Sequence, residues 1–220
     1  MGDLRSAWED EAEPWIAWAR TPGHDQWFWR WNWPAFAPLL GPPGARTLDL
    51  GCGEGRCGRL LAEQGHRVTG VDGSPTLVRH AREAGGYDEV LLADLGALPL
   101  ADASFDRVCA FMSLHDVDDL DAALREVHRV LAPGGSLGVA IYHPDRSAAM
   151  GQGDPAKAHR WSMTAEHAGL TMTFHSMHRP LAMVEAALGE AGLALTELRE
   201  PAPPEDLGPE PLFLHLVATR

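Results

Sequence analysis

The sequence predicts an α/β protein whose central sheet is mostly parallel and ends in an antiparallel hairpin. From residue 45 onward, short apolar runs typical of strands alternate with amphipathic helical patterns, which favours a parallel sheet with helices on both faces. Near the C-terminus two strand-like runs follow each other with no helical pattern between them, and such a connection favours antiparallel pairing.

The individual elements follow in chain order. In the alternating part we expect strands at Thr47–Leu50, Arg67–Val71, Glu89–Leu92, Phe105–Phe111 and Ser136–Tyr142. Helices are expected between them at Gly58–Gln64, Thr76–Ala84 and Leu120–Leu131. Beyond these, the sequence predicts a helix at Leu181–Ala191, which Gly192 would end, and two last strands at Leu193–Arg199 and Leu212–Thr219. The predicted sheet therefore has seven strands.

Residues 1–43 form a distinct segment that contains seven of the eight tryptophans. Trp15 and Trp18 are three apart, the spacing of one helix face, and a second helix is expected from Pro34 through Leu40. We therefore expect a small helical cap on a main domain at residues 44–220. The tryptophan rings either pack this cap onto the main domain or line an aromatic substrate pocket, and the candidates for the pocket are Trp18, Trp29 and Trp33.

Residues 144–178 lie inside the main domain and have few apolar repeats but several histidines. Long segments without a clear secondary-structure pattern often carry function. We expect this one to be a lid or a substrate-side insertion above the strand ends.

Composition limits the possible partners and location. The net charge is −13, from 18 basic and 31 acidic side chains, which argues against nucleic acid as a partner. The N-terminus does not resemble a signal peptide, and no run approaches the roughly 18 apolar residues of a membrane span. The cysteines, Cys52, Cys57 and Cys109, lack the spacing of a disulfide framework. These features predict a cytoplasmic protein that does not bind membranes.

The run from Leu48 to Arg56 is the most informative part of the chain. Gly51, Gly53 and Gly55 alternate where the first strand must turn into a helix, so a ligand could approach the backbone and the first N–H groups of that helix. The glycines also match G-x-G-x-x-G, and Asp72 lies where a dinucleotide site expects a ribose-binding acid. The loop alone therefore leaves a nicotinamide dinucleotide open as the cofactor.

Four further features favour another cofactor. Asp49 lies inside the strand, where its carboxylate would repel a pyrophosphate but attract an ammonium group, either directly or through water. Asp72, in Val71-Asp72-Gly73-Ser74, suits both hydroxyls of a ribose, and Asp94, in Ala93-Asp94, suits an adenine amino group. Leu131-Ala132-Pro133-Gly134-Gly135 is expected to form a turn before the fifth strand.

Together with the terminal hairpin, these blocks resemble the class I S-adenosylmethionine-dependent methyltransferases, and more narrowly their small-molecule branch. The resemblance covers about residues 45–143 and rests on L-D-x-G-C-G-x-G, V-D-x-S, S-F-D-x-V and L-x-P-G-G. It implies a Rossmann-like seven-stranded sheet and S-adenosyl-L-methionine as the cofactor. The cofactor would be bound by Asp49, Gly51, Cys52, Gly53, Asp72, Gly73, Ser74, Ala93, Asp94, Leu95, Phe111 and Met112. Asp72 and Asp94 could instead act only as helix caps.

Histidines at the ligand-bearing strand ends are the candidates for a general base. His115 follows the fourth strand, His143 follows the fifth, and His178 lies at the end of the 144–178 segment. Each could instead be structural. Tyr142 and His175 are candidates for substrate binding, although Tyr142 could serve only packing. No metal site is expected, because the spacing of His175 and His178 lacks a carboxylate or cysteine partner.

The predicted function is therefore methyl transfer to an oxygen, nitrogen or carbon atom of a small, flat or apolar molecule. Two alternatives remain: an NAD-dependent oxidoreductase, and a cofactor-binding scaffold or partner subunit without activity. A homodimer is possible, because an aromatic cap can pack within one chain or between two.

Overall fold

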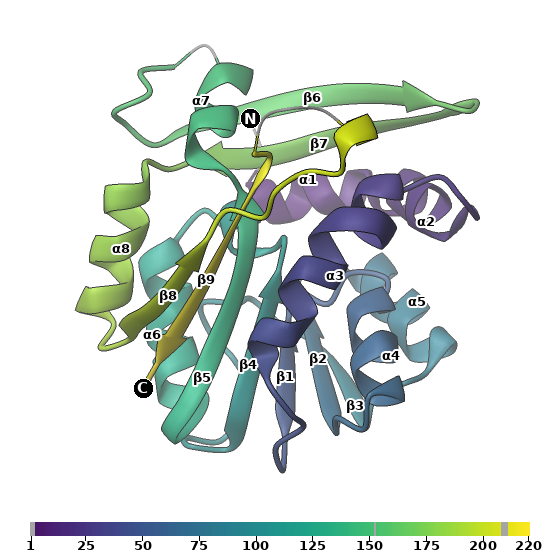
Figure 1. Ribbon diagram of the computed structural model, residues 1–220. Helices are drawn as coiled ribbons and strands as arrows, with labels where there is room; N and C mark the ends of the chain where they lie inside the picture. The colour runs from purple at the N-terminus through teal and green to yellow at the C-terminus, as the bar shows by residue number, and fades with distance from the viewer. Residues whose placement is uncertain (1–2, 152, 208–210) are drawn as a thin grey trace.

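The computed structural model describes residues 3–151, 153–207 and 211–220 and has the expected α/β architecture (Figure 1). Within these residues, seven strands form one sheet in the order β3-β2-β1-β4-β5-β9-β8. The strands from β1 to β5 pair in parallel, whereas β9 is antiparallel to both of its neighbours, β5 and β8. The predicted fold class is confirmed, including the terminal hairpin.

The strands lie close to their expected positions. They are β1 (Thr47–Leu50), β2 (Val68–Asp72), β3 (Glu89–Leu92), β4 (Phe105–Phe111), β5 (Leu131–Tyr142), β8 (Ala194–Arg199) and β9 (Phe213–Thr219). The fifth strand departs most from its expected bounds, since it begins at Leu131 instead of Ser136. Leu131 pairs with Phe105 before the register shifts, and Gly134 has φ +78°, so the expected turn is an irregular start of the strand itself.

Helices cover both faces of the sheet and enclose two main apolar layers. On one face, α6 (Leu120–Val130) and α8 (Leu181–Glu190) bury side chains such as Leu124 and Leu188 against the strands. On the other face lie α4 (Arg56–Glu63) and α5 (Pro75–Ala84). A short 3₁₀ helix at Leu114–Asp116 follows β4, and its Leu114 packs in the layer beneath α6 and α8. No described helix has the length and apolar character needed to cross a lipid bilayer.

The N-terminal segment is more helical than expected. It contains α1 (Leu4–Asp10), α2 (Ala12–Arg20), a π-helix (Phe28–Asn32), α3 (Trp33–Phe36) and a 3₁₀ helix (Ala37–Leu40). The helix expected to start at Pro34 therefore begins earlier. Proline lacks an N–H group and its ring crowds the carbonyl four residues before it, and the wider π turn just before Pro34 accommodates both effects. Phe36 and Leu40 pack into the core beside the sheet.

Residues 144–178 fold as α7 (Pro144–Met150) and a second sheet made of β6 (His159–His167) and β7 (Leu170–His178). In Figure 1 this hairpin extends across the top of the molecule, above α1 and α2. The sequence did not predict it, because Ala168 and Gly169 form its turn. Both have positive φ values, and alanine seldom adopts that conformation, so the usual asparagine–glycine hairpin signal is missing.

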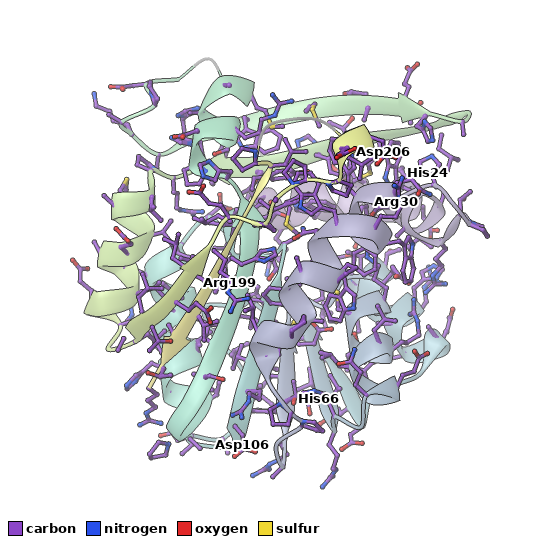
Figure 2. The ribbon with its side chains drawn as sticks, viewed as in Figure 1. His24, Arg30, His66, Asp106, Arg199 and Asp206 are labelled. Atoms are coloured by element: carbon purple, nitrogen blue, oxygen red, sulfur yellow. The ribbon has the colours of Figure 1, made fainter. Side chains whose placement is uncertain are left out.

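The connection between β8 and β9 is tied to the π-helix. The Arg30 guanidinium donates two hydrogen bonds to the Asp206 carboxylate, at 2.8 and 2.9 Å, and Figure 2 shows the two side chains together near His24. The indole Nε1 of Trp31 donates to the carbonyl of Pro201 at 3.2 Å. These contacts hold the N-terminal segment against a part of the chain about 170 residues away.

Candidate functional site

A cavity of about 850 Å³ lies at the carboxyl ends of the parallel strands. Such cavities in other proteins measure about 300–1,000 Å³, so this one has room for two small molecules side by side. Its floor comes from the turns that follow β1, β2, β3 and β4, and its roof from α1, α2, the π-helix and the β6–β7 hairpin. In an open α/β sheet this is the edge at which ligands bind.

The glycine run after β1 forms one end of the floor. Gly51, Gly53 and Gly55 have φ values of +73°, +56° and +94°, which residues other than glycine rarely adopt. A Cβ at Gly51 would lie 2.4 Å from the Cβ of Ser113, so the turn passes very close to the end of β4. The Ser113 hydroxyl donates a hydrogen bond to the carbonyl of Leu50, which fixes the end of β4 against the turn. The glycines at 51 and 53 line the cavity together with Cys52.

Asp72 closes the end of β2 beside this turn. One carboxylate oxygen accepts the backbone N–H of Gly53 at 2.8 Å, and the other accepts the N–H of Ser74 at 2.9 Å. Burial raises the pKa of Asp72, while these backbone hydrogen bonds act in the opposite direction. A carboxylate has about four acceptor positions, so Asp72 keeps some for a ligand in the cavity that it lines.

Asp94 lies at the open end of the cavity, after β3. Its side chain is 63% exposed, lies 3.8 Å from the Arg5 guanidinium, and accepts the N–H of Gly96 at 2.8 Å. Gly73, Ser74, Leu95, Phe111 and Met112 also line the cavity. Ala93 is not among the described lining residues, and its N–H donates to the carbonyl of Asp72.

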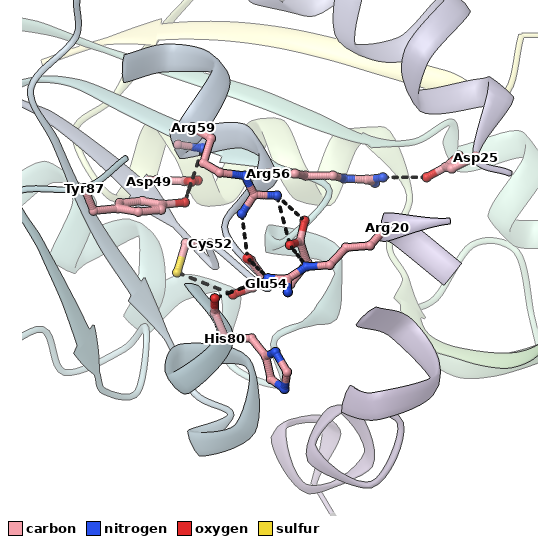
Figure 3. Close-up of polar contacts among 11 residues, drawn as sticks. Arg20, Asp25, Asp49, Cys52, Glu54, Arg56, Arg59, His80 and Tyr87 are labelled. Carbon is pink, nitrogen blue, oxygen red and sulfur yellow. Dashed lines mark hydrogen bonds and ion pairs between the residues drawn. The ribbon is translucent and has the colours of Figure 1, made fainter. Parts of the chain in front are cut away.

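The structure places Asp49 behind the glycine turn, without direct access to the cavity. Its side chain is 1% exposed, accepts the hydroxyl of Tyr87 at 2.8 Å, and is also not among the described residues that line the cavity (Figure 3). Burial raises the pKa of Asp49 to about 7. The middle strand of the parallel ladder turns this side chain into the protein between Gly70 and Cys109, away from the ligand edge.

Two arginines attach the N-terminal segment to the glycine turn. Glu54, 1% exposed, accepts hydrogen bonds from Arg20 of α2 at 2.7 Å and from Arg59 of α4 at 3.0 Å. Next to it, Arg56 bonds Asp25 at 2.7 Å, and its guanidinium carbon lies 3.6 Å from the ring centre of Phe28 and 4.9 Å from that of Trp15. Figure 3 shows Arg56 extending from the turn toward Asp25. The roof is thus held by buried and half-buried ion pairs.

Aromatic rings form the other half of the cavity. Trp15 lies edge-on to both Trp8 and Phe174, with ring centres 6.0 and 6.2 Å apart, and Trp18 lies 5.8 Å from Phe174 in the same manner. Among the expected substrate residues, Trp18, Tyr142 and His175 line this part. These rings give this half of the cavity mainly apolar walls.

Trp29 and Trp33 lie elsewhere, contrary to expectation. Trp29 is 46% exposed, whereas Trp33 packs in the core with Phe28, Phe36 and Phe111. Neither is among the described residues that line the cavity. Both tryptophans follow Phe28, the first residue of the π-helix. The π-helix has more residues per turn than an α-helix, and it directs the Phe28 ring toward the cavity and the Trp29 and Trp33 rings away from it.

The histidines expected to act as bases have different surroundings. His115 lines the cavity, and burial lowers its pKa to about 3, so its ring is neutral at pH 7. His178 is buried between the hydroxyl of Ser147 at 2.7 Å and the carbonyl of Pro155 at 2.9 Å. His143 faces Glu200 and caps α7. Neither His143 nor His178 belongs to the described lining, because β5 and β7 turn these side chains toward α7.

A family model and several curated relatives that match this chain are methyltransferases. A family model described as a methyltransferase domain matches residues 48–139. A malonyl-[acyl-carrier protein] O-methyltransferase of Erwinia pyrifoliae is 44% identical over 92 residues, 42% of this chain and 35% of that protein. A demethylmenaquinone methyltransferase of Thermus thermophilus is 38% identical over 128 residues, 56% of this chain and 58% of that protein.

A solved S-adenosylmethionine-dependent methyltransferase of Mesorhizobium loti extends the likeness beyond the matched segment. It has a TM-score of 0.67 and 29% identity, over 86% of this chain and 97% of that one. Residues 48–139 form a methyltransferase domain of the class I S-adenosylmethionine-dependent type. The chain spans about a third to three fifths of the two curated relatives above, and the family model covers the glycine turn and most of the parallel strands.

The residues of this methyltransferase fit its family's cofactor. Gly51 and Gly53 bring the backbone of the turn to the cavity, and Asp72 keeps free acceptor positions toward it. Asp94 is accessible at the mouth, beside the apolar side chain of Leu95. A ligand with a polar amino acid end, a diol and a flat base would find matching groups along this floor.

Sequence reasoning missed much of the roof of the methyltransferase. Trp15 shares the helical spacing that singled out Trp18, so its role could have been expected. Phe174 and Met163 come from the unpredicted hairpin, and Asn32 carries no sequence pattern that would have marked it. These side chains reach the cavity only because segments far apart in the chain pack together.

Proposed function

We propose that this protein transfers the methyl group of S-adenosylmethionine to an oxygen, nitrogen or carbon atom of a small, flat and mainly apolar molecule. The continuity of the cavity carries this proposal. One continuous cavity joins the glycine turn, Asp72 and Asp94 to the aromatic walls formed by Trp18 and Phe174. A donor on the floor and an acceptor against the rings would thus lie in the same cavity.

In this proposal the floor residues bind the cofactor. The backbone at Gly51 and Gly53 would hold the amino acid end, the Asp72 carboxylate the ribose diol, and Asp94 the adenine amino group. The cofactor supplies a methyl group on a sulfonium, which becomes a neutral thioether when an electron pair of the acceptor forms the new bond to carbon. Charge-assisted hydrogen bonds from the diol to Asp72 would anchor the donor.

The protein would accelerate the reaction mainly by alignment. Bringing two bound molecules into line removes much of the entropic barrier, and effective molarities for such alignment are large. His115 is a weak base because its pKa is lowered to about 3, and burial also raises the pKa of the neighbouring Asp116. His115 would therefore be neutral, and both groups would shape the cavity. An acceptor that loses its proton readily suits such a site.

The aromatic walls favour a flat ring over other acceptors. The relative from Thermus thermophilus is named for a quinone, and that from Erwinia pyrifoliae for a malonyl group on a carrier protein. Rings of Trp15, Trp18 and Phe174 lie close enough to stack on or against a flat acceptor. We therefore expect phenols, quinols or heteroaromatic amines and not carrier-bound malonyl groups.

Methyl transfer from isotope-labelled cofactor tests this proposal. The purified protein is incubated with labelled S-adenosylmethionine and a panel of phenols, quinols, indoles and carboxylic acids, and the products are identified by mass spectrometry. We expect label in at least one flat aromatic compound. Saturable binding of S-adenosylhomocysteine without transfer to this panel or to a cell extract would instead indicate a scaffold that only binds the cofactor.

A further inference from the structure

Asn32 is a buried polar residue in the aromatic half of the cavity. It is the last residue of the π-helix, its exposed fraction is 2%, and it lines the cavity. Its Oδ1 lies 2.7 Å from Nε2 of His215 on β9. Its Nδ2 donates no hydrogen bond to any residue in the described parts of the chain. Nδ2 is not among the fully buried atoms that lack a partner, so its donors are accessible to a molecule in the cavity that Asn32 lines.

His215 determines which way the amide points. Burial lowers the pKa of His215 to about 4, so the ring is neutral and carries one N–H. Nδ1 has no partner among the described residues, and a buried N–H without a partner is disfavoured more than a lone pair. The proton therefore lies on Nε2 and is donated to Oδ1 of Asn32. The amide nitrogen is left on the opposite branch of the side chain.

The backbone that carries Asn32 is held in place. The N–H of Trp33 donates to the carbonyl of Phe28, five residues earlier, which closes the π turn. The residues immediately before Asn32 are fixed to the connection between β8 and β9, Arg30 through Asp206 and Trp31 through Pro201. Phe36 packs against the ring of His215, with centres 5.4 Å apart. Both partners of the Asn32–His215 hydrogen bond are thus fixed before any ligand binds.

We propose that Asn32 is a specificity residue of the acceptor site, whose Nδ2 donates a hydrogen bond to a neutral carbonyl oxygen of the bound molecule. His215 is its positioning residue. This inference rests on the proposed function, because it places the acceptor in the aromatic half of the same cavity. It narrows the acceptor class to flat, mainly apolar molecules that carry a carbonyl group.

The charges around the cavity favour a neutral oxygen over an anion. The cationic group nearest the aromatic rings, Arg56, is already paired with Asp25 at 2.7 Å. The lining also contains the carboxyl groups of Asp72, Asp116 and Asp118. An amide donor suits a carbonyl oxygen, whereas an anionic ligand would need an uncompensated cation beside it.

A matched pair of probes tests this inference: 1-tetralone, which has a carbonyl oxygen, and tetralin, which has the same ring system without it. Affinities are measured by quenching of tryptophan fluorescence, with and without S-adenosylhomocysteine. We expect the wild-type protein to bind the ketone about fivefold more tightly than the hydrocarbon, the value of one ordinary hydrogen bond. Asn32→Leu, of nearly equal volume, should bring this ratio close to one.

His215 variants separate positioning from packing. His215→Leu should also lower the ratio, whereas His215→Gln, which keeps an N–H donor, should retain most of it. Asn32→Asp provides a second test if Asn32→Leu does not fold, because the carboxylate offers no donor and should reverse the preference. Circular dichroism checks that each variant is folded.

Two results would overturn the inference. One is a wild-type ratio near one, including the case in which neither probe binds. The other is a ratio that persists in the folded Asn32 variants. The proposed function is tested separately: it fails if the protein does not bind S-adenosylhomocysteine or does not transfer the methyl group. The probe ratio is also measured without that ligand, so either conclusion can fail by itself.

Discussion

The buried carboxyl group of Asp49 should make the stability of this protein depend on pH. Its side chain is 1% exposed, and burial raises its pKa from 3.8 to about 7. Between these two values the folded state holds a proton that the unfolded state has released. The free energy of unfolding therefore falls as pH rises from about 4 to about 7, and this contribution is constant above that range. Asp49→Asn removes the titrating group.

The magnitude follows from the two pKa values. One pH unit corresponds to about 1.4 kcal/mol, so the interval from 3.8 to about 7 corresponds to an ionisation penalty of about 4 kcal/mol at high pH. At about pH 5.5 roughly half of that penalty is present. Asp49→Asn also changes the hydrogen bond to Tyr87, but that effect does not vary with pH. The stability of the variant relative to wild type should thus improve by about 2 kcal/mol between about pH 5.5 and pH 8.5.

Urea unfolding at these two pH values measures this difference. Asp88→Asn is the matched control, because it also removes one negative charge but from an exposed carboxylate that pairs with Arg67. Its difference from wild type should not grow with pH. The reasoning is refuted if Asp49→Asn and Asp88→Asn show the same pH dependence, since Asp49 would then be ionised in the folded protein at both values.

Three further predictions concern the glycine turn and the cavity. Gly58→Ala should destabilise the protein by about 1–3 kcal/mol in thermal unfolding, because the added Cβ would lie 2.0 Å from the Tyr87 ring. The control is Gly189→Ala, whose added Cβ meets nothing within 4 Å, and this variant should be neutral or more stable by about 0.5–1 kcal/mol. Asp72→Ala should weaken binding of S-adenosylhomocysteine by about 1.5–3 kcal/mol in titration calorimetry, and an unchanged affinity would contradict its proposed role on the ribose. Trp18→Leu should raise the KM of an identified acceptor about threefold or more while the affinity for S-adenosylhomocysteine stays the same; a parallel loss of both would indicate a structural role instead.

The comparison of Gly53 and Gly58 shows how far local sequence can be interpreted. Both belong to the G-x-G-x-x-G pattern that left a dinucleotide open. Gly53 lines the cavity and donates its N–H to Asp72, whereas Gly58 is required by the ring of Tyr87. The motif thus combines a ligand-facing glycine with one that serves packing. Only the contact with a residue 29 positions later distinguishes them.

Asp49 and Asp72 show the same limit for charged residues. Both were expected to bind the cofactor from their places in family-like blocks. Asp72 ends its strand, so its side chain reaches the ligand edge of the sheet. Asp49 lies one residue inside its strand, where the alternation of side chains turns it into the protein toward Tyr87.

The sequence by itself determined the fold class, the order of the strands and helices of the seven-stranded sheet, and the floor of the site. These features depend on short-range patterns: apolar alternation, glycines at a strand end and acids at the next two strand ends. Tertiary structure alone decided the roof and the aromatic half of the cavity. Phe174, Asn32 and His215 meet there from a hairpin, a π turn and the last strand, and no local pattern encodes such contacts because they arise from packing between segments up to 183 residues apart.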